Sequence, residues 1–412
     1  MKKYVIIGNG IAAASCIEGI RSMDREGSIT VISAEKYPVY CRPLISYYLE
    51  DKTDLQRMGY RPANFYEENA CTVLYGKKAG HIDSKAKKVL LETGEILEYD
   101  ALCIAVGAEP FVPPMEGLEK VKEKYTFLTL EDALNIKKTV DADSRVLIIG
   151  AGLIGLKCAE GLHKTVKSIT VCDLSDRVLS SILDRESASL AQHHLEKNGI
   201  CFLLNDSVVR FEEKAAVMRS GARVEFDLVV LAVGVRANIG LIREIGGACS
   251  RGITVDTSMR TSIPAVFAAG DCTESMDISD KAVKVMALLP NASMQGRCAG
   301  INMAGGHSEF DCAVPMNSIG FFGFHVMTAG SRDASAEVYE ERSEEGLRKL
   351  FVKDGKLVGF ELIGDVARAG IYTNLIRTQT PLDAVDFENL KKNPNLFAFN
   401  QKYRKNILEG VV

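Results

Sequence analysis

Near the middle of the chain the sequence reads Arg145-Val-Leu-Ile-Ile-Gly150-Ala-Gly152-Leu-Ile-Gly155. A short apolar run leads directly into the spacing G-x-G-x-x-G, and the residues after it have a helical pattern. A second β-rich run ends at Asp173, 23 residues beyond Gly150. Glycines in such a turn let backbone N–H groups and the positive end of a helix approach a pyrophosphate. The stretch therefore predicts a β-α-β unit that binds a dinucleotide.

The same pattern occurs at the start of the chain. Residues 4–8 form an apolar run that leads into Gly8-Asn-Gly10-Ile-Ala-Ala13, where alanine takes the place of the third glycine. A helix is expected over residues 11–22 and a second strand over residues 28–33. Two such loops, each within a β-α-β pattern, arise by chance far less often than a single loop. The repeat predicts two dinucleotide-binding folds in one chain.

An acidic residue follows the second strand of each unit. Asp173 would accept a hydrogen bond from a ribose 2′-OH and repel a 2′-phosphate, which favours NADH over NADPH. Arg177 is close enough in sequence to bind a 2′-phosphate, so NADPH remains an alternative. Glu35, 27 residues past Gly8, is the corresponding candidate for an adenosine ribose hydroxyl; the alternative is a solvated loop residue.

Composition excludes several other classes of function. The 412 residues carry a formal net charge of −4 and no long run of like charges, so a nucleic-acid partner and an anionic membrane surface are not expected. No signal peptide or membrane span is apparent, and we expect a cytoplasmic protein. The eleven cysteines include no Cys-x-x-Cys, which argues against a zinc ribbon, a compact iron–sulfur motif or any other metal site.

Four further segments carry a specific resemblance. They are Ile104-Ala-Val-Gly107-Ala-Glu-Pro110, Leu231-Ala-Val-Gly234, Thr261-Ser-Ile-Pro-Ala-Val-Phe-Ala-Ala-Gly270-Asp271 and Pro290-Asn-Ala-Ser-Met-Gln295-Gly296. With the two loops, they resemble the FAD/NAD(P)-dependent pyridine nucleotide-disulfide oxidoreductase family of glutathione-reductase-like topology. The nearest branch contains rubredoxin reductases, nitrite-reductase flavin domains and NADH oxidases. The resemblance implies FAD at the first loop and NADH at the second.

The resemblance also implies residue roles. Asp271 would bond the ribityl chain of FAD, and the helix that begins near Pro290 would face the flavin pyrimidine with its positive end. The cofactor-binding residues expected on this basis are Gly8, Gly10, Ala13, Glu35, Arg42, Pro43, Ala105, Gly107, Gly150, Gly152, Gly155, Asp173, Gly234, Gly270, Asp271 and Gln295.

The expected fold class is α/β, with two doubly wound, Rossmann-like dinucleotide-binding domains of three layers and a C-terminal α+β domain. The FAD-binding domain is expected to be discontinuous, over residues 1–113 and 237–312, with the NAD-binding domain over 114–236. Residues 313–412 would form the third domain, in which Asp354-Gly355 predicts a hairpin turn.

The loop Tyr40-Cys41-Arg42-Pro43 follows the first unit and can be interpreted in two ways. Tyr-x-Arg-Pro resembles the branch that passes electrons on without a cysteine. Cys41, however, falls near the position where NADH oxidases and coenzyme A disulfide reductases carry a redox cysteine. A helix N-terminus and Arg42 beside it would favour the thiolate, and the alternative is an inert, partly buried thiol.

A second catalytic candidate is Lys157. The carrier-reducing relatives commonly place a lysine near flavin N5 and pair it with a glutamate of the NAD helix. The corresponding positions here are Tyr47 and Lys157, so the lysine would come from the NAD helix instead. We hypothesise that Lys157 supplies the cation near N5; a solvent-facing lysine in a first helical turn is the alternative.

Three functions remain open on the sequence. The preferred one is transfer of hydride from NADH to FAD, with electrons passed on to a small rubredoxin-like or ferredoxin-like carrier. The second is an NADH oxidase or low-molecular-weight disulfide reductase that uses Cys41. The third is a flavin-binding docking subunit of a larger redox complex. The family often dimerises through its third domain, so a homodimer through residues 313–412 is a further expectation.

Overall fold

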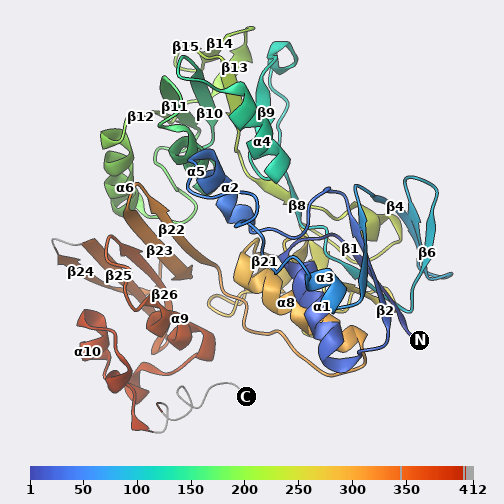
Figure 1. Cartoon of the computed structure of the whole chain (residues 1–412). Coiled ribbons are helices and arrows are strands. Elements are labelled where there is room, and N and C mark those ends of the chain that lie inside the picture. Colours follow the sequence, from blue (N-terminus) through green and yellow to red (C-terminus); the bar gives the residue numbers. More distant parts are fainter. Residues whose placement is uncertain (344–345, 402–403, 405–412) are drawn as a thin grey trace. The chain divides into compact units, whose positions relative to one another are not determined.

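The computed structural model describes residues 1–343, 346–401 and 404. They form two compact units, each of which is described by itself (Figure 1). The first unit comprises Met1–Ser181, Gln192–Ser275 and Lys284–Phe310; the second comprises Ile182–Ala191, Met276–Val283 and the described residues from Asp311 on. Within these residues, no helix is long and apolar enough to cross a membrane.

The first unit begins with a parallel sheet of strand order β19-β7-β1-β2-β3. Its strands are β1 (Lys3–Ile7), β2 (Ser28–Ser33), β3 (Cys71–Tyr75), β7 (Ala101–Ile104) and β19 (Val266–Ala268). An antiparallel sheet of β4 (Ala79–Asp83), β5 (Lys88–Leu91) and β6 (Ile96–Glu98) is inserted before β7. Alternate residues of β1, such as Val5 and Ile7, pack in the core that includes Val89 and Leu91 of this insertion. The helices α1 (Ile11–Met23) and α8 (Leu289–Met303) form the third layer.

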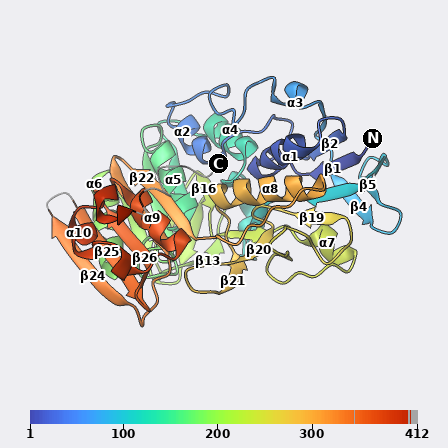
Figure 2. The same ribbon diagram turned by 90° about the horizontal axis from the view of Figure 1, so that it is seen from below.

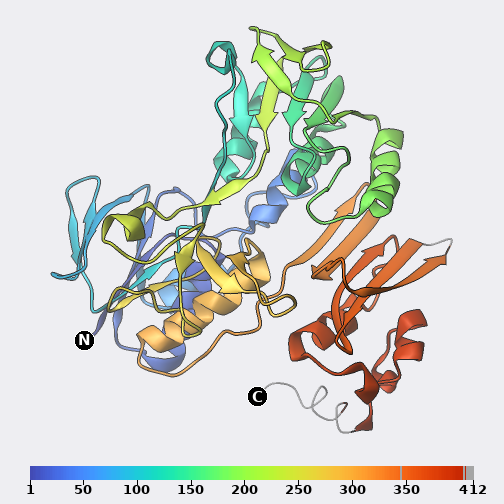
Figure 3. The same ribbon diagram turned by 180° about the vertical axis from the view of Figure 1, so that it is seen from behind.

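A second parallel sheet repeats this arrangement, with the order β12-β11-β10-β16-β9 (Figure 3). Its strands are β9 (Lys124–Thr126), β10 (Arg145–Ile149), β11 (Ser168–Asp173), β12 (Ile200–Leu204) and β16 (Leu228–Leu231). The inserted antiparallel sheet is again present, as β13 (Val208–Phe211), β14 (Ala215–Met218) and β15 (Arg223–Glu225). The helices are α4 (Leu130–Thr139) and α5 (Leu153–Leu162); α6 (Arg185–Lys197) begins in the second unit and continues into the first from Gln192. Both predicted β-α-β units are therefore confirmed, and so is the expected α/β fold class.

A two-stranded ribbon joins the two parallel-sheet layers of the first unit. β8 (Ala108–Pro110) pairs antiparallel with β17 (Val235–Ala237), so the outgoing and returning crossings lie side by side. The Asn238 amide side chain donates to the Val106 carbonyl at 3.0 Å, and its backbone N–H donates to the Gly107 carbonyl at 3.0 Å. The ribbon is thus fixed to the glycine turn at the end of β7.

Helices α1 and α8 pack against each other at unusually close range (Figure 2). A Cβ atom added to Gly296 would lie 2.1 Å from the Ala12 carbonyl oxygen, and one added to Gly300 would lie 2.1 Å from that of Cys16. Both neighbours are backbone atoms, which a rotamer change cannot move. The glycines of α8 therefore set the distance between the two helices that begin at the predicted FAD site.

The substitution Gly300→Ala tests this crossing. We expect it to lower the free energy of unfolding by roughly 1–3 kcal/mol, because the added methyl group forces the two backbones apart. Gly370→Ala is the matched control: this glycine of α9 (Ala369–Thr378) has open space at its Cβ position, so alanine should stabilise by about 0.5–1 kcal/mol. Calorimetric unfolding of both variants measures the difference; a neutral Gly300→Ala contradicts the close crossing.

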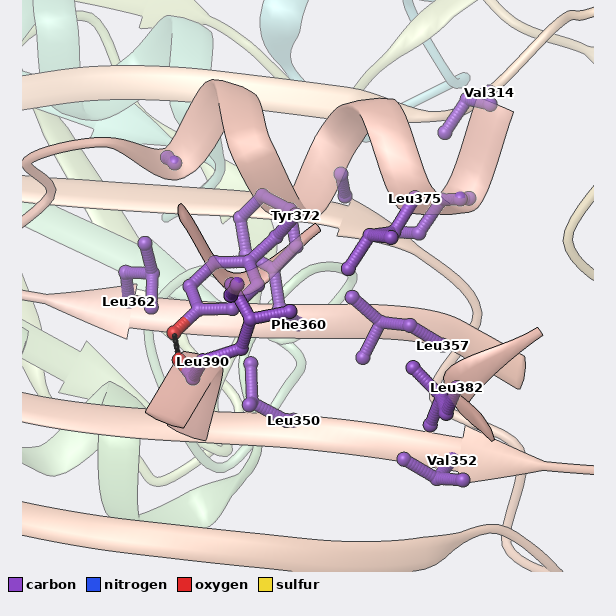
Figure 4. Close-up of a cluster of buried hydrophobic side chains, with 14 of the residues drawn as sticks. Val314, Leu350, Val352, Leu357, Phe360, Leu362, Tyr372, Leu375, Leu382 and Leu390 are labelled. Atoms are coloured by element: carbon purple, nitrogen blue, oxygen red, sulfur yellow. Dashed lines mark hydrogen bonds between the residues drawn. The ribbon is translucent and has the colours of Figure 1, made fainter. Parts of the chain in front are cut away.

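The second unit is built on an antiparallel sheet of order β22-β23-β26-β25-β24. Its strands are β22 (Met316–Phe321), β23 (Phe324–Gly330), β24 (Glu337–Ser343), β25 (Gly346–Lys353) and β26 (Lys356–Ile363), and the predicted hairpin turn at Asp354-Gly355 is confirmed. Helix α9 packs on this sheet, and its Tyr372 hydroxyl donates to the Leu390 carbonyl at 2.5 Å (Figure 4). The second unit therefore has the α+β fold that was expected for the C-terminal domain.

Residues 182–191 belong to the second unit through charged contacts. The Lys349 ammonium on β25 donates to the Asp184 carboxylate at 2.6 Å and to the Glu186 carboxylate at 2.7 Å. The Ser187 hydroxyl donates to Glu361 on β26 at 2.8 Å. Lys349 and Glu361 are both buried. A buried charge without a partner is costly, and these hydrogen bonds provide partners for both side chains.

Candidate functional site

The two glycine loops share one geometry. Gly8 has φ +110° and Gly150 has φ +114°, a region that side-chain-bearing residues rarely occupy. An added Cβ would lie 2.1 Å from the Ala105 carbonyl oxygen in the first loop and 2.2 Å from that of Ala232 in the second. Only glycine fits either turn. Each turn directs the following helix so that it begins at the carboxyl end of its parallel sheet.

The N-termini of the two helices are open to a ligand. Gly10 is the N-cap of α1 and Gly152 is the N-cap of α5, and neither provides a side-chain cap. A Cβ at either position would meet nothing within 4 Å. Backbone N–H groups at a helix N-terminus lack partners within the helix and attract anions. The two loops therefore fit the pyrophosphate groups of two dinucleotides, as at the expected FAD and NADH sites.

The third position of the motif differs between the loops for a steric reason. A Cβ on Gly155 would lie 2.0 Å from the Gly150 carbonyl oxygen, so the second loop requires glycine. Ala13 occupies the equivalent place in α1 and is completely buried. The first loop thus accommodates a methyl group where the second does not.

Glu35 is surrounded by donors. Its carboxylate accepts a hydrogen bond from the Tyr40 hydroxyl at 2.7 Å and forms an ion pair with the Arg42 guanidinium. Arg42 also donates to the Leu128 carbonyl at 3.2 Å. Glu35 is therefore an anchored carboxylate at the end of the first β-α-β unit, which differs from the alternative of a solvated loop residue.

Asp271 and its turn complete the first site. Burial raises the pKa of the Asp271 carboxyl, and the nearby Arg42 guanidinium opposes that shift. Among the described residues, no side chain or backbone group donates a hydrogen bond to the Asp271 carboxylate, which suits a ligand hydroxyl. The Gln295 side chain accepts from the Gly270 N–H at 2.7 Å and donates to Ser275 at 2.7 Å. Gln295 thus holds the Gly270 turn in place through its side chain.

Asp173 lies at the second loop. One of its oxygens accepts from the Ala151 N–H at 2.7 Å, and the other accepts from the Ser175 N–H at 2.7 Å. A carboxylate oxygen has a further lone pair, so a ribose hydroxyl can still donate to Asp173. The Arg177 guanidinium, which could have bound the 2′-phosphate of NADPH, donates a hydrogen bond to the Asp176 carboxylate at 2.8 Å.

The remaining glycines of the expected site lie at the two crossings. Ala105 is the first residue after β7, and Gly107, two positions further on, has φ +64°. Gly234 has φ +111° and lies after β16. Pro43 lies in the first turn of a short 3₁₀ helix, Arg42–Leu44. The predicted residues therefore gather in two groups, one at the carboxyl end of each parallel sheet.

Cys41 has an environment that differs from the expected one. Burial raises the pKa of its thiol, and Arg42, whose charge was expected to favour the thiolate, is bound to Glu35 instead. These contacts of the chain itself do not favour the thiolate expected at Cys41, and a redox role for this cysteine stays a prediction.

Lys157 lies on the face of α5 that meets the short helix α2 (Ile45–Leu49). Its ammonium is 4.8 Å from the centre of the Tyr47 ring and forms an ion pair with the buried carboxylate of Glu160. Only 16% of the Lys157 side chain is exposed, so it is not a solvent-facing lysine. The two helices can approach closely because Gly161 has no side chain. A Cβ atom at this position would lie 2.9 Å from the Ser46 carbonyl oxygen.

Two residues of this site were assigned no role of their own from the sequence. Tyr40 connects Glu35 with the start of α4, and Glu160 provides the carboxylate for Lys157. The three-residue spacing of Lys157 and Glu160 on one helix is a signal that could have been used. No sequence signal indicates the Tyr40 contact, because its partner lies 90 residues away. The described residues contain no group of three His, Cys, Asp or Glu side chains placed to hold a metal ion.

Residues 2–296 match the sequence family described as pyridine nucleotide-disulphide oxidoreductase. The chain belongs to this family. It is accordingly an oxidoreductase that uses FAD and a pyridine nucleotide. The fold agrees: the reductase in the putidaredoxin reductase–putidaredoxin complex superposes with a TM-score of 0.87 over 99% of this chain and 98% of its own, at 23% identity.

Three curated relatives span nearly the same length as this oxidoreductase. The epsilon subunit of NADH-dependent phenylglyoxylate dehydrogenase from Aromatoleum evansii is 31% identical, and the match covers 92% of each chain. An NADH oxidase from Methanocaldococcus jannaschii is 31% identical, with 88% of this chain and 87% of the relative covered. An NADH-rubredoxin oxidoreductase from Clostridium acetobutylicum is 26% identical, with 89% and 92% covered.

Proposed function

We propose that this oxidoreductase passes electrons from NADH through FAD to a small iron–sulfur or rubredoxin-like protein. The observation that carries the proposal is the environment of Cys41. Its thiol is favoured in the neutral form, and the cation expected to activate it is engaged by Glu35. An acceptor that needs no cysteine nucleophile is then the simplest route for the electrons, and the relative named as an NADH-rubredoxin oxidoreductase supports it.

The residues divide between the two cofactors. FAD would bind with its pyrophosphate at Gly8 and Gly10, its adenosine ribose at Glu35 and its ribityl chain at Asp271. NADH would bind at the second loop, with Asp173 as the acceptor for its ribose. When bound, the two cofactors supply hydride transfer between nicotinamide and flavin.

The chain contributes position and charge to that reaction. The glycine loops and anchored carboxylates hold each dinucleotide in one orientation. We hypothesise that Lys157 lies near flavin N5, where its ammonium would stabilise developing negative charge. Glu160 and the Tyr47 ring hold the ammonium in place.

Cys41→Ser tests the proposal against the cysteine-dependent alternatives. We expect anaerobic titration with NADH to bleach the flavin with two electrons in the wild type and in the variant alike. NADH-dependent reduction of added rubredoxin or ferredoxin should also stay within about twofold of the wild-type rate, because serine preserves the size of a half-buried side chain that takes no part in transfer.

The opposite result has a distinct signature. Uptake of four electrons, or a long-wavelength charge-transfer band that Cys41→Ser lacks, would identify Cys41 as a redox group and favour the oxidase or disulfide-reductase alternative. Cys201→Ser is the matched control, because this exposed cysteine lies on β12, outside the expected FAD site.

A second candidate function is an electron-input subunit of a larger redox complex. It is favoured by the relative from Aromatoleum evansii, which is named as a subunit and matches this chain over nearly its whole length. Purification of the tagged chain from its own cells separates the candidates. A stoichiometric complex that reduces its substrate with NADH favours a subunit, whereas an isolated chain that reduces a free carrier favours the first proposal.

A further inference from the structure

The Tyr40 hydroxyl bridges two parts of the first unit. It donates to one Glu35 oxygen at 2.7 Å and accepts from the Leu130 N–H of α4 at 2.9 Å. The residue is 8% exposed, and burial raises the pKa of its phenol, so it stays protonated and able to donate. One buried hydroxyl thus joins the expected ribose carboxylate of FAD to a helix of the second parallel-sheet layer.

This contact completes the first turn of α4. The Thr129 hydroxyl accepts from the Asp132 N–H, and the Asp132 carboxylate accepts from the N–H groups of Leu128 and Thr129. The Leu130 N–H belongs to the first four donors, which have no partner within a helix. Tyr40 satisfies that donor from outside the helix. Loss of its hydroxyl would leave the N–H unsatisfied in a buried place.

Arg42 provides a second connection between the same partners. Its guanidinium pairs with the other Glu35 oxygen and donates to the Leu128 carbonyl at 3.2 Å. Both oxygens of Glu35 are therefore bound by side chains that also hold residues 128–130. Helix α4 packs on β9, the edge strand of the second parallel sheet. Glu35 is thus connected to that layer through two side chains, Tyr40 and Arg42.

We propose that Tyr40 is a positioning residue that couples occupancy of the FAD site at Glu35 to the placement of α4, and so to binding of the second dinucleotide. A ribose that donates to Glu35 fixes the carboxylate, and the fixed carboxylate orders Tyr40 and the first turn of α4. NAD⁺ then binds a layer that is already ordered, which is positive cooperativity. The inference rests on the proposed assignment of Glu35 to FAD.

The coupling is measured as a ratio of two FAD dissociation constants. FAD is titrated into the apoprotein with and without saturating NAD⁺, which does not reduce the flavin, and binding is followed by flavin fluorescence. In the wild type we expect NAD⁺ to tighten FAD about fivefold or more. In Tyr40→Phe the ratio should fall below about twofold, because the phenyl ring keeps the packing and loses only the bridge.

Two further variants separate the bridge from general loop effects. Tyr37→Phe removes a hydroxyl that donates to Glu131 at 2.8 Å, from the same loop to the same helix but without contact to Glu35, and should keep the wild-type ratio. Leu130→Pro removes the N–H that Tyr40 accepts from, at the first helical position, where proline is tolerated. It should lose the coupling while the Tyr40–Glu35 bond remains.

Three results would overturn the inference. The wild type could show no effect of NAD⁺ on FAD binding, or Tyr40→Phe could weaken FAD equally with and without NAD⁺, in which case Tyr40 only orients Glu35. Retention of the ratio in Tyr40→Phe would also refute it. Failure of the proposed function is distinguishable, because it would appear as a wild-type flavin that NADH fails to bleach or that no carrier can reoxidise.

Discussion

Gly8→Ala should yield a colourless protein, and Gly150→Ala should yield a yellow protein that NADH no longer reduces. In each case the methyl group would lie about 2 Å from a carbonyl oxygen, and the backbone φ is one that alanine rarely adopts. Strain and overpacking of roughly 1–3 kcal/mol each weaken dinucleotide binding by about a hundredfold or more. Flavin absorbance of the purified proteins and stopped-flow bleaching by NADH measure the two outcomes.

The pair of variants also assigns the two loops. Gly94→Ala is the matched control, since Gly94 has φ +88° but open space at its Cβ position, in the turn between β5 and β6. It should retain both flavin and reduction by NADH. If Gly8→Ala keeps its flavin while Gly150→Ala loses it, the assignment of FAD to the first loop is reversed.

Lys157→Met should slow flavin bleaching by NADH more than about tenfold, which corresponds to roughly 1.4 kcal/mol of transition-state stabilisation. The side chain keeps its length and its contact with the Tyr47 ring but loses the positive charge. The apparent dissociation constant of NADH should change little, because Lys157 lies beyond the glycine loop on α5. Stopped-flow traces over a range of NADH concentrations separate the two constants.

Glu160→Gln is the companion variant. It removes the negative charge that pairs with Lys157 and leaves the ammonium in place, so the bleaching rate should remain within about threefold of the wild type. Equal slowing in both variants would show that the packing between α2 and α5, rather than the charge of Lys157, controls the rate. An unchanged rate in Lys157→Met removes the hypothesis.

Local patterns in the sequence predicted the parallel sheets and their glycine turns. Gly8 and Gly150 each follow an apolar run and precede a helix, and that short-range order determines both the positive φ and the open helix N-terminus. The turn at Asp354-Gly355 is local in the same sense. Features of this kind depend on residues a few positions apart, so a single sequence is sufficient to predict them.

Features that depend on distant residues were not predictable in the same way. Burial raises the pKa of the Cys41 thiol, and that burial depends on how the folded loop packs rather than on its neighbours in the sequence. The bond from Leu130 to Tyr40 joins residues 90 positions apart. No periodicity in residues 182–191 indicates that this segment packs with the C-terminal unit.

That last segment has a consequence for the order in which the chain can fold during synthesis. Asp184 is bonded to Lys349, and 165 positions separate them along the chain. At about 5–20 residues per second, a ribosome adds Lys349 roughly 8–33 seconds after Asp184. The ion pairs at the start of α6 can therefore form only after Lys349 of β25 has been synthesised. The Asp184 and Glu186 carboxylates would thus leave the ribosome well before the buried ammonium with which they pair.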